Sequence, residues 1–296
     1  MSDKYRNVQN WIEYSLFRVL LAILRIIPYQ ISQSIAIALF LMIGYGIGIR
    51  RKLAYAQLRK IYPEKSRKQL NTILLKLYKN MALSICEIYL LKDRALISNS
   101  RVEGMENVQE AFSLGRGIIL ATFHFGNWEA ARVLPRFGIP LSVVVKKQRN
   151  RLFNNYTNQI RTRQGVKIID MKRGLRDITK YLNQNEMVAI LTDQNSGDKG
   201  LITNFLGYPA FHWKGAAKLS LRMKVPVIVG LCLRDERSRA VFKFDRMIYH
   251  PELEDNDNNI LMLIEEINAI QESYIHAYPH LWFWVHRRWR GSYEML

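Results

Sequence analysis

The chain has 296 residues, of which 49% are hydrophobic and 23% are charged. This composition is typical of a folded protein with a sizeable core, and it excludes an intrinsically disordered chain. The 44 basic and 25 acidic residues give a net charge of +19, which suits an anionic partner such as nucleic acid, acidic lipid headgroups or an acidic carrier protein. The two cysteines, Cys86 and Cys232, both lie inside apolar runs. They form neither a metal-spaced pair nor a disulfide framework, so we expect core positions and a reducing compartment.

The N-terminal region is apolar and lacks the layout of a signal peptide. Its apolar part carries two charged side chains, Arg18 and Arg25. Because these are seven residues apart and share one helical face, residues 16–27 are expected to form an amphipathic helix in the membrane surface. Residues 35–49 offer about 15 uncharged positions, short of the roughly 20 that a span requires, and the basic run that follows would anchor their end on the cytoplasmic side. A spanning helix, surface attachment and a buried hairpin of a soluble protein all stay open.

The rest of the chain predicts helices followed by an α/β region. Residues 53–98 show apolar side chains at helical spacing, which we assign to core packing. Apolar runs then alternate with helical patterns, which predicts an α/β fold with a mainly parallel or mixed central sheet flanked by helices. The expected strands are residues 101–104, 118–123, 141–145, 166–169, 187–191, 225–233 and 241–248. The expected helices are residues 107–114, 128–137, 173–184, 213–223 and 259–276.

Two units follow from this division of the chain. Residues 1–52 are expected to form a membrane-associating helical region. Residues 53–296 are expected to form the main domain, which is helical over residues 53–98 and α/β over residues 99–296.

The stretch from Gly117 to Glu129 carries the strongest chemical pattern. An apolar strand ends at His124, and a Gly-Asn turn leads into a helical pattern with Glu129 in its first turn. With His124 on the turn, the two side chains can meet. The carboxylate would then orient the imidazole and raise its basicity, as a general base for a hydroxyl group requires. The plainer interpretation is an exposed loop histidine followed by an acid that suits the helix dipole.

Basic residues gather next to two of the expected strands. Residues 146–151 form a cluster after one strand, and Arg161 and Arg163 precede another. Such clusters suit phosphate or carboxylate oxygens. Solvated surface charge is the alternative for most of these residues.

Asp193 and Gln194 follow the expected strand at residues 187–191. Ligand sites in sheets of this class lie beyond the C-terminal ends of strands, where both His124 and Asp193 fall. A buried aspartate at a strand end could equally cap a turn.

The motif His124-Phe-Gly-Asn127-Trp-Glu129 resembles the H-x4-D/E block of glycerolipid-type acyltransferases, and its Gly-Asn-Trp-Glu form resembles the bacterial lipid A biosynthesis acyltransferase family. The resemblance extends from about Arg18 to Arg290. It makes Arg161 or Arg163 the arginine of the family's second block, with a slight preference for Arg163. The run that begins at Asp193-Gln194 resembles a third block.

Two later stretches complete the resemblance. Residues 203–209 resemble the end of the third block, but Leu206 stands where the family often has the second phenylalanine of a pair, so acyl chain length stays open. The tail at residues 279–290 resembles the family's ending, in which a tryptophan is followed by His-Arg-Arg. Its interleaved tryptophans and arginines suit a belt at the level of lipid headgroups, or single-stranded nucleic acid.

The resemblance implies a membrane-associated O-acyltransferase that moves a fatty acyl chain from acyl carrier protein to a hydroxyl of a lipid A precursor. His124 would be the general base and Glu129 its orienting partner. The expected substrate-binding residues are Arg163, Arg161, Asp193, Gln194 and Asn127. The acidic carrier agrees with the charge of +19, and the expected location is the cytoplasmic face of the inner membrane.

The partners expected are acyl carrier protein, a glycolipid acceptor and membrane lipids, with no cofactor, no metal and no nucleic acid. One alternative is an acyltransferase for another glycolipid, such as a phosphatidylinositol mannoside. The other is a non-enzymatic basic protein that binds membranes or nucleic acid.

Overall fold

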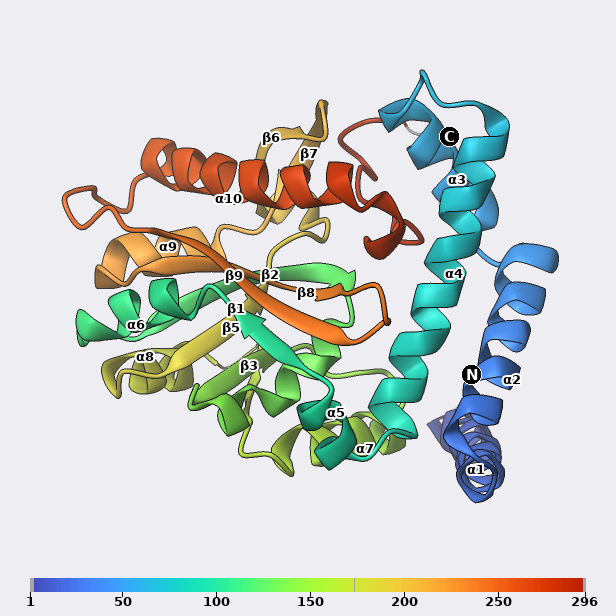
Figure 1. Ribbon diagram of the computed structural model, residues 1–296. Helices are drawn as coiled ribbons and strands as arrows, with labels where there is room; N and C mark the ends of the chain where they lie inside the picture. Colours follow the sequence, from blue (N-terminus) through green and yellow to red (C-terminus); the bar gives the residue numbers. More distant parts are fainter. Residues whose placement is uncertain (1–2, 173, 295–296) are drawn as a thin grey trace.

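A mixed sheet of seven strands lies at the centre of the computed structural model, which describes residues 3–172 and 174–294 (Figure 1). The strand order is β1-β9-β8-β2-β5-β3-β4, and β8 and β9 form the one antiparallel pair among these described strands. The strands are β1 Arg101–Glu103, β2 Ile118–Gly126, β3 Leu141–Val145, β4 Lys167–Asp170, β5 Met187–Leu191, β8 Val227–Arg234 and β9 Ala240–Ile248. The expected mixed α/β fold is confirmed.

Helices cover both faces of the sheet because both faces are apolar. Successive side chains of a strand point to opposite faces. Ile119 and Ala121 of β2 therefore pack into one buried cluster with α9 and α10, while Ile118 and Leu120 pack into another with α6 and the 3₁₀ helix η2. The helices of this region are α5 Asp93–Ser98, α6 Met105–Ser113, η2 Trp128–Phe137, α7 Arg151–Thr162, α8 Leu175–Asn183, α9 Gly215–Met223 and α10 Asp257–Ala277. Both cysteines are buried and free, as expected.

The observed elements differ from the expected ones mainly at their ends. The strand that carries His124 continues to Gly126, because β2 still pairs with β8 at that residue after a register shift. The expected helix after the turn is a 3₁₀ helix with Pro135 inside it, and proline removes a helical hydrogen bond. Residue 173, where another helix was expected to begin, lies outside the described residues. A two-stranded hairpin, β6 Leu201–Phe205 and β7 Tyr208–His212, and a short helix η3 Gly197–Lys199 follow β5.

The N-terminal third of the chain is helical and lies along one side of the α/β layer (Figure 1). It comprises α1 Asp3–Ile26, α2 Tyr29–Phe40, the π-helix η1 Leu41–Gly46, α3 Arg51–Ile61 and α4 Arg67–Tyr89. A capping box of Ser66 and Gln69 starts α4, which satisfies backbone donors that would otherwise lack partners. The helix α2 packs along α4. The separation into two units at residue 52 stays a prediction.

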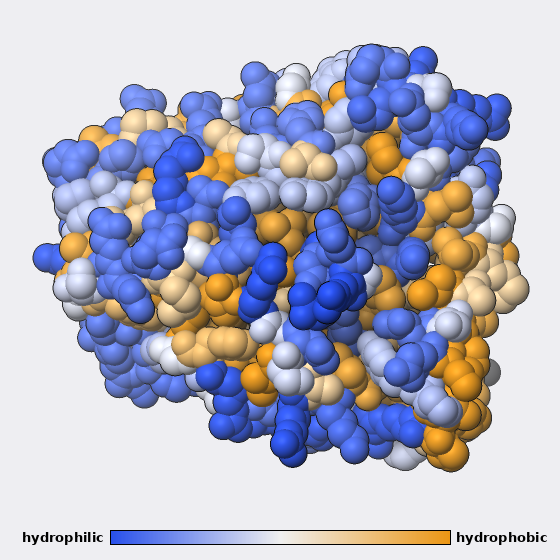
Figure 2. Space-filling view, viewed as in Figure 1, coloured by the Kyte–Doolittle hydropathy of each residue, from blue (hydrophilic) through white to orange (hydrophobic). Residues whose placement is uncertain are grey.

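The outer side of α1 is apolar. Val8, Ile12, Leu16, Val19, Ile23 and Ile26 recur three or four residues apart, and each is more than half exposed. In Figure 2 the hydrophobic surface is concentrated at the lower right, where Figure 1 places α1 and α2. Among the described residues, Tyr29–Gly46 is the segment that is long and apolar enough to cross a membrane.

The C-terminal tail is part of the core, which corrects the expected headgroup belt. Trp282, Trp284, Arg288 and Trp289 are each at most 2% exposed. The buried amide of Gln57 on α3 donates to the carbonyls of Trp284 and His286 and accepts from the backbone N–H of Arg288. The tail therefore packs against α3, and these tryptophans are not available to lipid headgroups or to nucleic acid bases.

Candidate active site

The site is built at the C-terminal end of β2, where His124 lies inside the strand and the chain then turns sharply. Gly126 makes this turn with φ of +58°, a conformation that glycine adopts without steric cost. A Cβ atom at Gly126 would lie 1.8 Å from the carbonyl oxygen of Cys232, so no other residue fits. Asn80 and Ser84 of α4 donate to the carbonyl of Gly126 at 3.4 and 3.3 Å. The turn after His124 is thus held by close packing against Cys232 of β8 and by hydrogen bonds from α4.

His124 and Asp193 meet because β2 and β5 are parallel neighbours. Thr122 of β2 pairs with Leu191 of β5, which places the residues two positions further along side by side. His124 Nδ1 lies 2.8 Å from Asp193 Oδ1, and the backbone N–H of His124 donates to Asp193 Oδ2 at 3.0 Å. The indole Nε1 of Trp282 donates to the same Oδ2 at 2.9 Å. The imidazole therefore has a carboxylate partner, and it is Asp193 rather than Glu129.

The hydrogen bond from His124 to Asp193 selects the tautomer of the neutral imidazole. The carboxyl group is almost fully buried, and burial alone would raise its pKa; the charge of His124 and the hydrogen bonds from His124 and Trp282 outweigh this and hold its pKa below the usual range. A carboxylate only accepts, so Nδ1 donates in this hydrogen bond, and in the neutral form of the ring the lone pair is then on Nε2. Gln194 Nε2 lies 3.1 Å from His124 Nε2 and donates to it.

Glu129 has a different partner from the one expected. Its two carboxylate oxygens accept from Nε and Nη2 of Arg161, with Nε at 2.8 Å, in a bidentate ion pair. Arg161 comes from the last turn of α7 and also donates to Asn158. Both side chains are mostly buried. The pair joins α7 to the start of η2, next to Trp128, and so supports the wall of the site.

A second ion pair lies beneath the turn. Glu87 of α4 is buried, and both of its carboxylate oxygens accept from Arg234 of β8. Asn127 is 1% exposed and donates its amide to the same carboxylate. The amide of Asn127 is therefore bound within the protein, and its oxygen has no hydrogen-bond partner among the described residues. The sequence did not indicate the roles of Glu87, Arg234 and Trp282. Glu87 lies in a helix assigned to core packing, Arg234 follows an expected strand, and Trp282 was assigned to a headgroup belt.

Aromatic side chains enclose the imidazole. The ring of His124 lies 4.8 Å from that of Trp128, edge to face, and 5.9 Å from that of Phe283. Both of these rings also line an apolar cavity of about 320 Å³ between the turn, α4 and α2. The other apolar residues that line it are Phe40, Leu77, Met81, Ile85, Ile88 and Leu281. A hydrocarbon chain in this cavity would end beside the histidine.

The two arginines that the family resemblance left as alternatives, Arg161 and Arg163, lie in different places. Arg161 binds Glu129 beside the histidine site, whereas Arg163 lines a second cavity near the end of α1. Of the basic cluster at 146–151, Lys147 pairs with Asp170 at 2.8 Å. Within the described part of the chain, no three His, Cys, Asp or Glu side chains are grouped as metal ligands would be.

Comparison with known proteins defines the class. The sequence profile of the bacterial lipid A biosynthesis acyltransferase family matches residues 1–291. A lipid A biosynthesis acyltransferase of Haemophilus influenzae is 22% identical over 96% of this chain and 89% of its own length. A lipid A biosynthesis palmitoleoyltransferase of Escherichia coli K12 is 21% identical over 89% of this chain and 86% of its own.

Two more distant likenesses were found. A phosphatidylinositol mannoside acyltransferase of Mycobacterium tuberculosis is 21% identical over 64% of this chain and 59% of its own length. The crystal structure of a 1-acyl-sn-glycerophosphate acyltransferase from Thermotoga maritima matches 84% of this chain and 98% of its own, with a TM-score of 0.40 and 14% identity.

The protein is an acyltransferase. It belongs to the bacterial lipid A biosynthesis acyltransferase family, as the resemblance of its motifs predicted.

Proposed function

We propose that this enzyme transfers a fatty acyl chain from acyl carrier protein to a hydroxyl group of a lipid A precursor, with His124 as the general base. The observation that carries the proposal is the hydrogen bond between buried Asp193 and His124 Nδ1, which leaves Nε2 as the ring atom that can accept a proton. A thioester is already activated, so a positioned base is sufficient and a covalent nucleophile is not required.

The proposed reaction is a direct transfer. His124 Nε2 takes the proton of the acceptor hydroxyl as its oxygen attacks the thioester carbonyl. The tetrahedral intermediate then collapses, the carbon–sulfur bond breaks, and the imidazolium returns the proton to the leaving thiolate. Asp193 stabilises the imidazolium between these steps and keeps the ring in one orientation.

Other site residues have supporting roles in this proposal. Arg161 and Glu129 hold the start of η2, and Gln194 occupies the position at Nε2 that the acceptor hydroxyl would take. Asn127 orders the turn through Glu87. The relatives that act on phosphatidylinositol mannosides make another glycolipid the alternative acceptor. The net charge of +19 supports an acidic carrier protein as donor.

The cavity beside His124 is proposed to hold the donor's acyl chain, and this can be tested through chain length. Met81 lines the cavity, so Met81→Trp should fill part of it. Each methylene that can no longer be buried costs about 0.8 kcal/mol, or roughly fourfold in kcat/KM. We expect kcat/KM for the longest donors to fall on the order of tenfold or more, because two to three of their methylenes can no longer be buried. The kcat/KM for shorter donors should stay close to that of the wild type.

The measurement is kcat/KM for a series of acyl carrier protein thioesters. Leu75→Trp is the matched control, because Leu75 lies on the same helix, is 39% exposed and does not line the cavity. An unchanged chain-length profile in Met81→Trp would place the chain elsewhere.

We also propose that α1 lies in the membrane surface with its apolar side in the lipid, on the cytoplasmic face of the inner membrane. The exposed row of apolar residues on α1 supports this. The packing of α2 along α4 supports attachment to the surface over a span, since α4 belongs to the body of the enzyme.

This attachment predicts the behaviour of a double variant, Val19→Asp with Ile23→Asp. Removing two apolar side chains from lipid should cost about 3–6 kcal/mol, a loss of at least 10²-fold in membrane partition. Wild-type protein should stay in the membrane fraction at high salt, and the double variant should be released. Leu175→Asp with Ile202→Asp makes the same change at exposed residues of α8 and β6, and this variant should not be released. Retention of the α1 variant would mean that another segment, such as Tyr29–Gly46, anchors the protein.

A further inference from the structure

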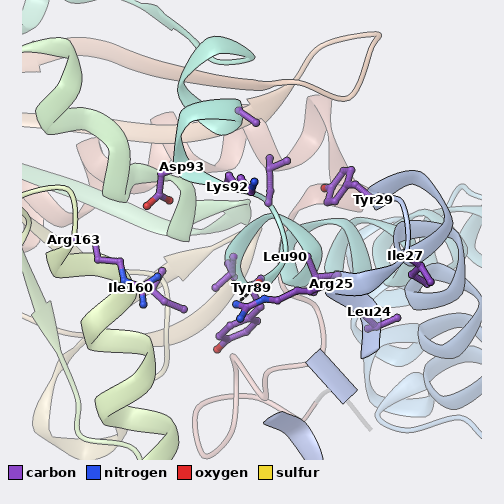
Figure 3. Close-up of a pocket in the computed structure, with 13 residues that line it drawn as sticks. Leu24, Arg25, Ile27, Tyr29, Tyr89, Leu90, Lys92, Asp93, Ile160 and Arg163 are labelled. Atoms are coloured by element: carbon purple, nitrogen blue, oxygen red, sulfur yellow. Dashed lines mark hydrogen bonds between the residues drawn. The ribbon is translucent and has the colours of Figure 1, made fainter. Parts of the chain in front are cut away.

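A second cavity, of about 550 Å³, lies between the end of α1, the loop from α4 to α5 and the end of α7. Figure 3 shows Arg25, Lys92 and Arg163 on its walls, each from a different one of these elements. None of the three takes part in the proposed chemistry at His124. The cavity therefore requires an explanation of its own.

The cavity carries uncompensated positive charge. Its one carboxylate, Asp93, is already bound by Nε of Arg132 at 3.0 Å and by the amide of Gln164 at 2.9 Å. No described carboxylate pairs with Lys92 or Arg163. Arg25 uses one terminal nitrogen to donate to the carbonyl of Tyr89 and the hydroxyl of Tyr156, which holds the guanidinium in place. Its Nε and other terminal nitrogen have no acceptor among the described residues.

The rest of the lining shows what kind of anion fits. Leu24, Ile27, Ile88 and Ile160 form an apolar wall beside the cations. Leu24, Arg25 and Ile27 line the cavity, and Ile23 and Ile26 of the exposed apolar row are their neighbours in the sequence of α1. A ligand with an anionic head and attached hydrocarbon would place its head among the cations and its chains along α1.

We propose that this cavity binds the phosphate monoester of a lipid. A phosphate monoester carries a charge of about −1.5 to −2 at neutral pH and three strong acceptor oxygens. The cavity offers it three cationic side chains from separate elements. Arginine binds phosphate in a bidentate geometry, and two of the three cations are arginines. The proposal rests on the proposed function in one respect: the lipid would be the acyl acceptor, held by its phosphate.

The position of the cavity relative to the base supports this role. Arg163 lies two residues beyond Arg161, which binds Glu129 at the start of η2. Arg132, which binds Asp93 at the cavity, lies in the same helix η2. A phosphate bound at Arg163 is thus connected through rigid contacts to the wall of the histidine site, so it can set the position of the acceptor's hydroxyl.

The first test compares acceptors with the full-length enzyme in detergent. One acceptor carries its phosphate monoester, and the other is the same lipid after removal of that phosphate. Arg163→Gln and Lys92→Gln should each raise KM for the phosphorylated acceptor on the order of tenfold, as expected for a lost charge-assisted hydrogen bond, with kcat little changed. For the dephosphorylated acceptor, both variants should raise KM much less than for the phosphorylated one. Arg222→Gln, an exposed arginine on α9, should change neither value.

The second test measures binding without catalysis, so that failure of the proposed function can be told from failure of this site. His124→Ala protein is floated with neutral vesicles that contain either phosphatidic acid, a monoester, or phosphatidylglycerol, a diester. The expected result is that His124→Ala protein prefers the vesicles with phosphatidic acid. The triple variant His124→Ala, Arg163→Gln, Lys92→Gln should lose this preference. Equal binding to both vesicles, or a preference that survives loss of the two cations, would overturn the proposal. Inorganic phosphate that abolishes the preference at concentrations comparable with the lipid would identify a free anion as the ligand and overturn the lipid assignment.

Discussion

His124→Ala should reduce kcat for acyl transfer by about 10²- to 10⁴-fold, the usual contribution of a positioned general base. The imidazole is mostly enclosed by Trp128, Phe283 and Asp193, and Nε2 is its atom that can accept a proton. Alanine leaves the strand pairing of β2 unchanged, because the hydrogen bonds of the ladder come from the backbone. KM for the acyl donor should therefore change little. Circular dichroism and thermal unfolding check that the variant is folded.

His280→Ala is a suitable control for this variant. His280 is a partly buried histidine in the short helix η4 Pro279–Leu281, and among the described residues it makes no hydrogen bond to His124 or Asp193. It should keep turnover close to that of the wild type. A folded His124→Ala enzyme with equally high turnover would show that His124 is not the base.

Asp193→Asn should reduce kcat almost as much as His124→Ala does, and the hydrogen bonds of Asp193 explain why. Oδ2 accepts from two N–H donors, the backbone of His124 and the indole of Trp282. An asparagine would keep its oxygen there and present its NH₂ group to His124 Nδ1. The ring would then carry its proton on Nε2 and could not accept one from the acceptor. We expect a loss in kcat of at least about 10²-fold, with little change in KM.

The double variant His124→Ala with Asp193→Asn should be hardly slower than His124→Ala alone, because the two residues act as one unit. Asp255→Asn, at an exposed position before α10, is the control and should be silent. Losses that multiply in the double variant would mean that Asp193 acts independently of the imidazole. Glu129→Gln offers a further contrast, since it weakens the ion pair with Arg161 and leaves the hydrogen bonds of the imidazole in place.

The sequence was informative where the physical signal is local. Apolar runs bounded by turns gave the strands of the central sheet, and the rule that sites lie at the C-terminal ends of strands placed His124 and Asp193 in the same region. That they touch depends on β2 and β5 being neighbours. Strand order comes from packing over the whole domain and has no signature in either strand.

The choice of carboxylate shows why local spacing was not enough. Glu129 is five residues from His124, and the motif pairs the two by proximity in sequence. Glu129 instead binds Arg161, which lies 32 positions later on α7. This helix was not predicted from the sequence, because the basic residues on either side of it were assigned to charged clusters next to strands. The tail was assigned to the lipid surface because its tryptophans and arginines are typical of such surfaces. The same residues also occur in cores where their polar groups find partners, and local sequence does not distinguish the two environments. Gln57 supplies those partners, and nothing near it in the sequence indicates this.

The central claim is acyl transfer to a glycolipid with His124 as the base, and mass spectrometry of the reaction product tests it most directly. Purified enzyme is incubated with acyl carrier protein thioester and a lipid A precursor. The predicted result is a product heavier than the precursor by one acyl chain, formed by wild-type enzyme and reduced at least 10²-fold with folded His124→Ala. The same yield of acylated product from both proteins, or no acylated lipid from the wild type with any glycolipid acceptor, would contradict it.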